Sequence, residues 1–152
     1  PLTQHYAGIF SGFLNESAQI ARSTAANIVQ NPIMTERQFY AQVKSNLRHN
    51  RIVYGSAIAF ERDPDYDNDL FAPYAYRTSG KSQSLDIADI TDYTKGGWQW
   101  WDKAKQAGHP IWTDPYFDKG VGNIVMATYG VPFFHKKKFR GVVTVDVQLE
   151  IL

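Results

Sequence analysis

The chain has 152 residues, which suits a single domain, and 43% of them are hydrophobic, enough for a sizeable core. The net charge of +1 argues against a nucleic-acid-binding surface, and the absence of cysteine excludes a disulfide framework, thiol catalysis and cysteine-based zinc sites. No apolar run approaches the roughly 18 residues that span a membrane. Because the chain begins at Pro1 rather than Met, we expect it to be a segment of a larger protein.

Two helices are predicted at the N-terminal end. Apolar residues recur at spacings of three and four over 5–31, which predicts one long amphipathic helix that Pro32 ends. Thr35 and Gln38 have the spacing of a capping box, so a second helix is expected from Thr35 to 49–50. Its buried stripe consists of Phe39, Val43 and Leu47.

From residue 51 the pattern becomes that of strands. Residues 52–60 are rich in β-formers and predict a buried strand. Residues 70–77 and 83–87 flank a turn at 78–81 and predict a hairpin.

A short helix and a second hairpin complete the predicted elements. The helix covers 98–107, and Gly108 stands at the position that favours a left-handed residue after a helix. Two strands, 123–133 and 139–149, are joined by a tight basic turn at 135–138. The order of elements predicts an α+β fold with an antiparallel sheet of about five strands and helices packed on it.

The last strand alternates regularly between two faces. Val143, Val145, Val147 and Leu149 share one face, and Val142, Thr144, Asp146 and Gln148 share the other. One face must be core, and the other presents a carboxylate.

Common catalytic, phosphate-binding and metal-binding motifs are absent from the sequence. The aspartates alternating over 63–69 begin like an EF-hand loop, but Asn68 and Tyr74 stand where that loop needs Gly and Glu. The lysines at 136–138 are typical of a solvated hairpin turn. We therefore expect no metal, no cofactor and no nucleic-acid partner.

Aromatic residues cluster after residue 92. Tyr93, Trp98, Trp100 and Trp101 lie within nine positions. On a helix, Trp98 and Trp101 share a face while Trp100 points elsewhere. This group can therefore both anchor the helix and line a cavity.

Two carboxylates accompany these rings. Pro115 fixes an extended turn that can hold Tyr116 and Asp118 pointing the same way, and Asp146 lies among valines, where a charge is costly without a partner. Aromatic faces and carboxylates suit a small cation, with a plausible affinity of about −8 kcal/mol. The alternative is that the rings are core and that a backbone group or a Tyr hydroxyl satisfies Asp146.

The sequence resembles the Cache (PDC) extracytoplasmic sensor domains over nearly its whole length. The segments that carry the resemblance are 100–104, 112–118 and 141–149, in this order and at suitable spacing. The resemblance implies a PAS-like sheet preceded by a long helix. It predicts one sensor module over 1–152, with a helical part at 1–50 and a sheet with a pocket at 51–152.

One subset of double Cache sensors binds amino acids through a pattern of Tyr, Arg, Trp, Tyr, Tyr, Asp and Asp. By this resemblance, Tyr93 matches the leading Tyr, Trp100 matches the Trp, and Trp101 stands where the family has Tyr. Such domains sit between transmembrane helices of chemoreceptors, histidine kinases, diguanylate cyclases and phosphatases. The chain stops where a second module would follow, so both a single module and the distal half of a longer ectodomain remain open.

The last three positions of the pattern match this sequence, whereas the Arg position does not. Tyr116 and Asp118 match the next Tyr and Asp, and Asp146 matches the final Asp. Trp98 occupies the position of the Arg that clamps the ligand carboxylate, and an indole cannot make that bidentate contact. By resemblance, a related amine-sensing subset also lacks this Arg, so we expect an amine or amino-acid-like ligand, with Lys95 as the alternative carboxylate partner.

The expected protein is therefore a periplasmic or extracellular ligand-binding module, not an enzyme, with flanking transmembrane helices. A homodimer through the long helix stays open. One alternative is a small α+β carbohydrate-active enzyme that uses Asp118 and Asp146 as an acid–base pair. Another is a protein-interaction or dimerisation module, in which Trp98, Trp100 and Trp101 would be exposed.

Overall fold

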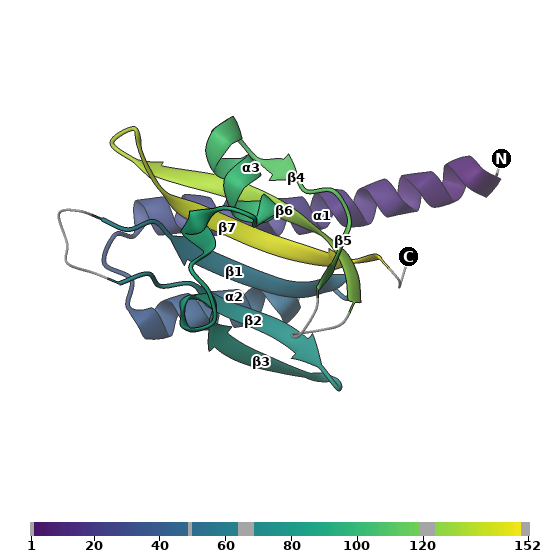
Figure 1. The fold of residues 1–152 in the computed structure, drawn as a ribbon. Coiled ribbons are helices and arrows are strands. Elements are labelled where there is room, and N and C mark those ends of the chain that lie inside the picture. The colour runs from purple at the N-terminus through teal and green to yellow at the C-terminus, as the bar shows by residue number, and fades with distance from the viewer. Residues whose placement is uncertain (1, 49, 64–68, 119–123, 150–152) are drawn as a thin grey trace.

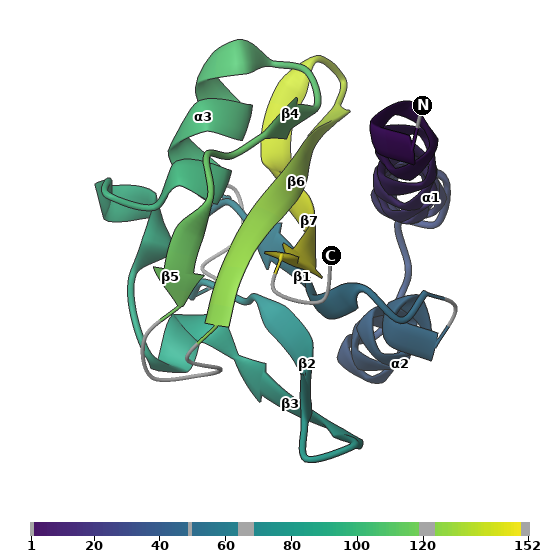
Figure 2. The ribbon, with the colours of Figure 1, turned by 90° about the vertical axis from the view of Figure 1, so that its right-hand side faces the viewer.

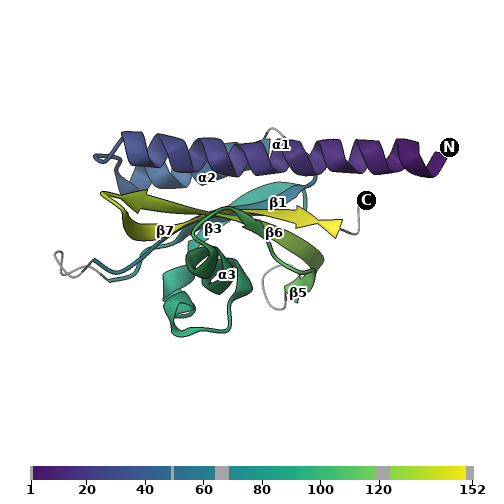
Figure 3. The same cartoon turned by 90° about the horizontal axis from the view of Figure 1, so that it is seen from above.

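The fold is known from a computed structural model that describes residues 2–48, 50–63, 69–118 and 124–149, without the side chains of residues 2, 3, 6 and 7. A single antiparallel sheet separates two helical layers (Figures 2 and 3). The helices are α1 (Leu2–Gln30), α2 (Glu36–Arg48) and α3 (Gln99–Ala107), and two short 3-10 turns are η1 (Ile87–Asp89) and η2 (Tyr93–Lys95). The α+β architecture predicted from the sequence is confirmed.

The sheet has seven strands in the order β3-β2-β1-β7-β6-β4, and β5 also pairs with β6 (Figure 1). The strands are β1 (Val53–Phe60), β2 (Pro73–Thr78), β3 (Lys81–Asp86), β4 (Ile111–Trp112), β5 (Tyr116–Asp118), β6 (Ile124–His135) and β7 (Lys138–Gln148). The sequence predicted about five of them. It missed β4 and β5 because two or three residues carry no periodic signal.

Helices α1 and α2 cover one face of the sheet. The capping box is present, since the Thr35 amide donates to Gln38 Oε1 at 2.8 Å and the Gln38 amide donates to Thr35 Oγ1 at 3.2 Å. The predicted stripe of α2 packs against the sheet, with Val43 and Leu47 buried and Phe39 partly buried. His49, at the predicted end of this helix, lies outside the described residues.

The N-terminal half of α1 extends beyond the sheet (Figures 1 and 3). Ile9, Phe10 and Phe13 on this half are between 37% and 43% exposed. β7 runs toward the same end of the molecule (Figure 1). The start of α1 and the end of β7 therefore lie on the same side of the molecule (Figure 1).

Helix α3 covers the opposite face of the sheet (Figure 3). The helix ends as predicted at Gly108, which has φ +70° and whose amide donates to the Ala104 carbonyl at 3.0 Å. Both faces of β7 are therefore buried, with Val143 and Val145 under α1 and α2, and Val142 under α3. Asp146 faces the α3 side, in a layer closed from solvent rather than on an open face.

Candidate functional site

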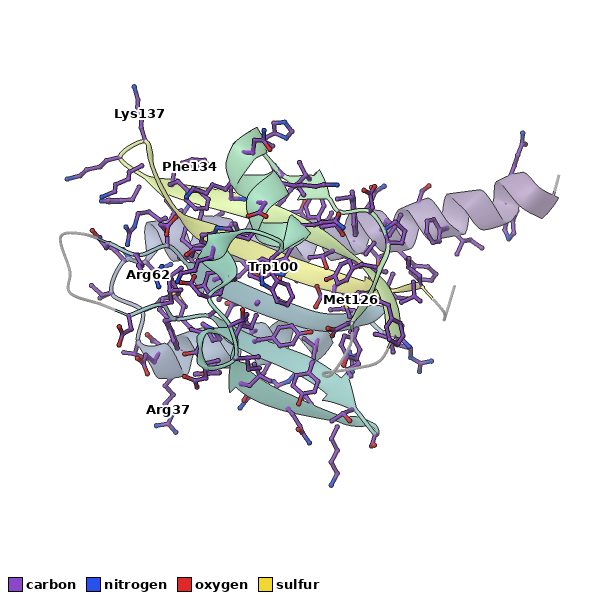
Figure 4. All side chains as sticks on the ribbon, in the orientation of Figure 1. Arg37, Arg62, Trp100, Met126, Phe134 and Lys137 are labelled. Atoms are coloured by element: carbon purple, nitrogen blue, oxygen red, sulfur yellow. The ribbon has the colours of Figure 1, made fainter. Side chains whose placement is uncertain are left out.

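A cavity of about 140 Å³ lies on the α3 side of the sheet. Every strand except β4 contributes to it, together with α3 and the segment that joins β3 to α3. Trp100 and Met126, which both line the cavity, lie on this face of the sheet in Figure 4. A cavity of about this volume holds a molecule the size of benzene.

Asp146 lines this cavity and is only 5% exposed. Its Oδ1 accepts a hydrogen bond from Thr128 Oγ1 at 2.7 Å, and its Oδ2 accepts one from the Tyr74 hydroxyl at 2.9 Å. The Tyr116 hydroxyl lies 2.5 Å from Thr128 Oγ1. Because the single hydroxyl proton of Thr128 goes to Asp146, Tyr116 donates to Thr128.

These contacts match part of the alternative interpretation, in which a Tyr hydroxyl satisfies Asp146. The carboxylate nevertheless borders open space in the cavity. A carboxylate has about four lone-pair positions, and the two hydroxyls use two of them. Asp146 can therefore accept a further hydrogen bond from a ligand.

Gly55 makes this arrangement sterically feasible. It lies opposite Asp146 in the pairing of β1 with β7, at a break in the strand register. A Cβ atom at this position would lie 2.8 Å from Asp146 Oδ2 and would also overlap the Tyr74 hydroxyl. The missing side chain lets Tyr74 reach from β2 across β1 to β7.

The electrostatics of the cavity favour positive charge. Burial raises the pKa of Asp146 to about 7; hydrogen bonds from Thr128 and Tyr74 act against this shift, and the charge of Asp118 adds to it. Burial also raises the pKa of Asp118, which is half-buried and lines the same cavity. Among the described residues, no Lys, Arg or His side chain lines the cavity.

Four aromatic residues form walls of the cavity: Tyr74, Trp98, Trp100 and Tyr116. Trp100 is 8% exposed, whereas Trp98 is 40% exposed. A cation at the face of such rings gains about 0.5–2 kcal/mol. The predicted residues that meet at the cavity are therefore Trp98, Trp100, Tyr116, Asp118 and Asp146.

The structure does not bring Tyr93 and Trp101 to the cavity. Both are almost fully buried, and their rings meet edge to face at 4.8 Å. The Tyr93 hydroxyl donates to the Phe60 carbonyl at 2.6 Å, and Trp101 packs against Phe139 at 5.3 Å. These two residues support the cavity wall from behind.

The prediction that Trp98 and Trp101 share a helix face was wrong. Trp98 precedes the helix in extended conformation, with φ −107° and ψ 105°, so helical spacing does not apply to it. Trp98 and Trp100 line the cavity together, and Trp101 turns into the core. The interaction-module alternative needs three exposed tryptophans, whereas Trp100 and Trp101 are buried.

Tyr74 and Thr128 were not identified as site residues from the sequence. Tyr74 lies 72 positions from Asp146 and Thr128 lies 18 positions from it, and both are paired with Asp146 only through the order of strands in the sheet. The Tyr-x-Tyr alternation at 74–76 marks one face of β2, but nothing local indicates what that face meets.

The remaining motifs lie away from the cavity. Lys95 does not line it, and two lysines of the predicted basic turn, Lys136 and Lys137, form the tight turn with positive φ. Asp63 pairs with Lys138 and Arg140, whereas residues 64–68 of the acidic loop lie outside the described residues. In the part of the chain that the structure describes, no group of three potential metal ligands occurs.

A sheet with a long helix on one face and a small cavity under a short helix on the other defines a PAS-like sensor module. The family model for the first PDC sensor domain of methyl-accepting chemotaxis protein-like proteins matches residues 39–152. The chain therefore belongs to this family of sensor domains, and the resemblance found in the sequence is confirmed. No curated protein sequence matches the chain.

Several solved structures share this fold. The extracellular domain of soHK1S-Z6, a predicted histidine kinase, is 33% identical, with a TM-score of 0.83 over 96% of this chain and 57% of the other. A protein named methyl-accepting chemotaxis protein X is 22% identical, with a TM-score of 0.79 over 97% and 60%. The ligand-binding domain of the Campylobacter jejuni chemoreceptor Tlp3, solved with L-valine, is 18% identical, with a TM-score of 0.67 over 93% and 55%.

The first of these structures is the extracellular domain of a histidine kinase, and the third is the ligand-binding domain of a chemoreceptor. The chain spans somewhat more than half the length of each of them. Within the described residues, no helix has the length and apolarity to cross a membrane.

Proposed function

We propose that this domain senses a small organic amine for a membrane-bound signalling receptor. The observation that carries the proposal is a buried carboxylate, Asp146, at an aromatic-walled cavity without a cationic lining side chain among the described residues. A protonated amine supplies the missing positive charge and donates to the free lone pairs of Asp146. Trp98, Trp100 and Tyr116 provide the aromatic surface around it.

The cavity disfavours the carboxylate of an α-amino acid. Trp98 stands where the amino-acid-binding pattern has Arg, and the indole offers one N–H and no charge. The charges of Asp118 and Asp146 repel a second carboxylate, in a partly desolvated site where such repulsion is strong. An amine without a carboxylate therefore fits the charge distribution better than a standard amino acid.

The proposed signal travels to the end of the molecule where α1 projects and β7 ends. In the complete receptor, we propose that transmembrane helices flank this module on the periplasmic or extracellular side of the membrane. Exposed Ile9, Phe10 and Phe13 support pairing of α1 with a second copy of the chain. The amine changes the position of these ends only as far as it binds one conformation more tightly than the other.

Isothermal titration calorimetry with matched ligand pairs tests the proposal. n-Butylamine is compared with norvaline, which adds a carboxylate to the same skeleton, and with n-butanol, which removes the charge. Benzylamine and phenylglycine form a second pair for an aromatic tail. We expect the amines to bind and the amino acids and the alcohol to bind at least tenfold more weakly. Equal or tighter binding of the amino acids, or no binding of any amine, contradicts the proposal.

A further inference from the structure

A second hollow adjoins the cavity. It has a volume of about 280 Å³ and is lined by residues 97–100 and 116–118. Four residues line both spaces: Trp98, Trp100, Tyr116 and Asp118. We call the space with Asp146 the inner cavity and the second space the outer hollow. The shared walls make them neighbouring compartments with Asp118 at their boundary.

The outer hollow contains two side-chain hydrogen-bond acceptors, on Asp118 and Gln99. Asp118 contributes a half-buried carboxylate. Gln99 also lines the hollow, and its side-chain Oε1 is buried and has no hydrogen-bond partner among the described residues. The Gly97 amide, a potential donor here, already donates to Asp102 Oδ2 at 2.9 Å. A buried acceptor without a partner is costly, so a donor from a ligand would relieve it.

The two compartments together carry two carboxylates and no cationic lining side chain among the described residues. A monoamine bound to Asp146 leaves the negative charge of Asp118 without a positive partner. Like charges in a partly buried site oppose each other's ionisation, and a second positive charge removes this opposition. Charge balance over both compartments therefore calls for a ligand with two positive charges.

We infer that the ligand is a linear diamine, with one ammonium on Asp146 in the inner cavity and the other between Asp118 and Gln99 in the outer hollow. This inference rests on the proposed function and narrows its ligand class. The methylene chain lies along the shared wall of Trp98, Trp100 and Tyr116, which offers it apolar surface. Two fixed anchors also select one chain length, because a shorter diamine cannot reach both acceptors and a longer one must buckle.

Calorimetry with butane-1,4-diamine and n-butylamine, which share one carbon skeleton, tests this inference, and diamines of three to six methylenes define the preferred length. We expect the preferred diamine to bind about three- to tenfold more tightly than the monoamine of equal length, because its second ammonium forms one additional, partly exposed ion pair. Asp118→Asn should bring this ratio of affinities down to about two, the statistical factor for a ligand with two equivalent ammonium groups, and Gln99→Leu should lower it. Asp114→Asn removes an exposed carboxylate outside both compartments and should leave the ratio unchanged.

The outcomes separate the two proposals. If n-butylamine binds and no diamine exceeds its affinity by more than the statistical factor of about two, the diamine inference is wrong while the amine-sensing function stands. If Asp114→Asn lowers the affinity ratio as much as Asp118→Asn does, nonspecific electrostatic attraction explains why the diamine binds more tightly. The inference is then also wrong. If neither ligand class binds, the proposed function itself fails. Should Asp118→Asn not fold, judged by its circular dichroism, the wild-type ratio and Gln99→Leu decide the question.

Discussion

The Tyr74 hydroxyl donates a hydrogen bond to Asp146 Oδ2 at 2.9 Å, although the two residues lie on strands that are not neighbours. Strand β1 separates them, and Gly55 is the residue of β1 over which they meet. This crossing holds the Asp146 carboxylate in one orientation at the edge of the cavity. The position of the charge therefore depends on a glycine that makes no polar side-chain contact.

The substitution Gly55→Ala should destabilise the protein and weaken amine binding. The added methyl group overlaps the Tyr74 hydroxyl and Asp146 Oδ2, so one of them must move, at a cost of about 1–3 kcal/mol. Urea denaturation measures the loss. Gly12→Ala on α1 is the control, because nothing lies near its Cβ position, and it should stabilise the helix by about 0.5–1 kcal/mol. Equal stability of Gly55→Ala and wild type would show that the crossing is not tightly packed.

The free energy of unfolding should fall as the pH rises from 4 to 7. The pKa of Asp146 is about 7 in the folded protein and about 3.9 in an unfolded chain, so in this window the native state binds more protons. Asp118, whose pKa is also raised, acts in the same direction. Asp92 acts oppositely, because hydrogen bonds from Thr94 and Arg62 lower its pKa to about 2, but its contribution is nearly complete by about pH 5.

The variant Asp146→Asn isolates this effect. In the wild type, the free energy of unfolding should fall by at most roughly 4 kcal/mol over this pH range because of Asp146. In Asp146→Asn, most of this fall should be absent. Urea denaturation at several pH values gives both curves. Parallel curves for the variant and the wild type would mean that Asp146 does not titrate in this window.

Thr128 should set the pH at which the amine binds. Its hydroxyl donates to Asp146 and lowers the pKa of that carboxyl, so Thr128→Val should raise this pKa further. Wild-type affinity for n-butylamine should increase between pH 6 and 8 as Asp146 loses its proton, and the midpoint should move upward in the variant. Thr91→Val, at another residue of the cavity wall, should leave the midpoint in place. Calorimetry over this pH range measures both midpoints, and identical values would contradict the role of Thr128.

Two tryptophans three positions apart should respond in opposite ways to truncation. Trp101→Ala removes a buried ring from the core and should cost about 3–5 kcal/mol of stability. Trp98→Ala removes a ring that is 40% exposed and should cost less than about 1 kcal/mol, but it should weaken n-butylamine binding several-fold. Denaturation and calorimetry on both variants distinguish the roles, and unchanged binding in Trp98→Ala would remove this residue from the proposed site.

Local signals in the sequence were sufficient for most elements of the fold. The capping box at Thr35, the left-handed Gly108 and the alternation around Asp146 each depend on a few neighbouring residues, and all three are present in the structure. The short strands β4 and β5 were missed because their conformation follows from pairing with β6 rather than from a pattern of their own.

The site was harder to predict because its contacts cross the sheet. The sequence analysis identified Asp146, Trp100 and Tyr116 as candidate site residues. Tyr74 and Thr128 become partners of Asp146 only through the order and register of the strands. Trp101 carries the same local signal as Trp100, and both belong to the buried cluster under α3, yet only Trp100 also lines the cavity. Only the direction of α3 relative to the sheet separates them.

Calorimetric titration of n-butylamine into the wild type and Asp146→Asn at pH 8 tests the central claim most directly. The account predicts binding to the wild type and at least tenfold weaker binding to the variant, with both proteins folded by circular dichroism at the temperature of the titration. Equal affinity in the two folded proteins would contradict the claim that the buried carboxylate recognises a cation.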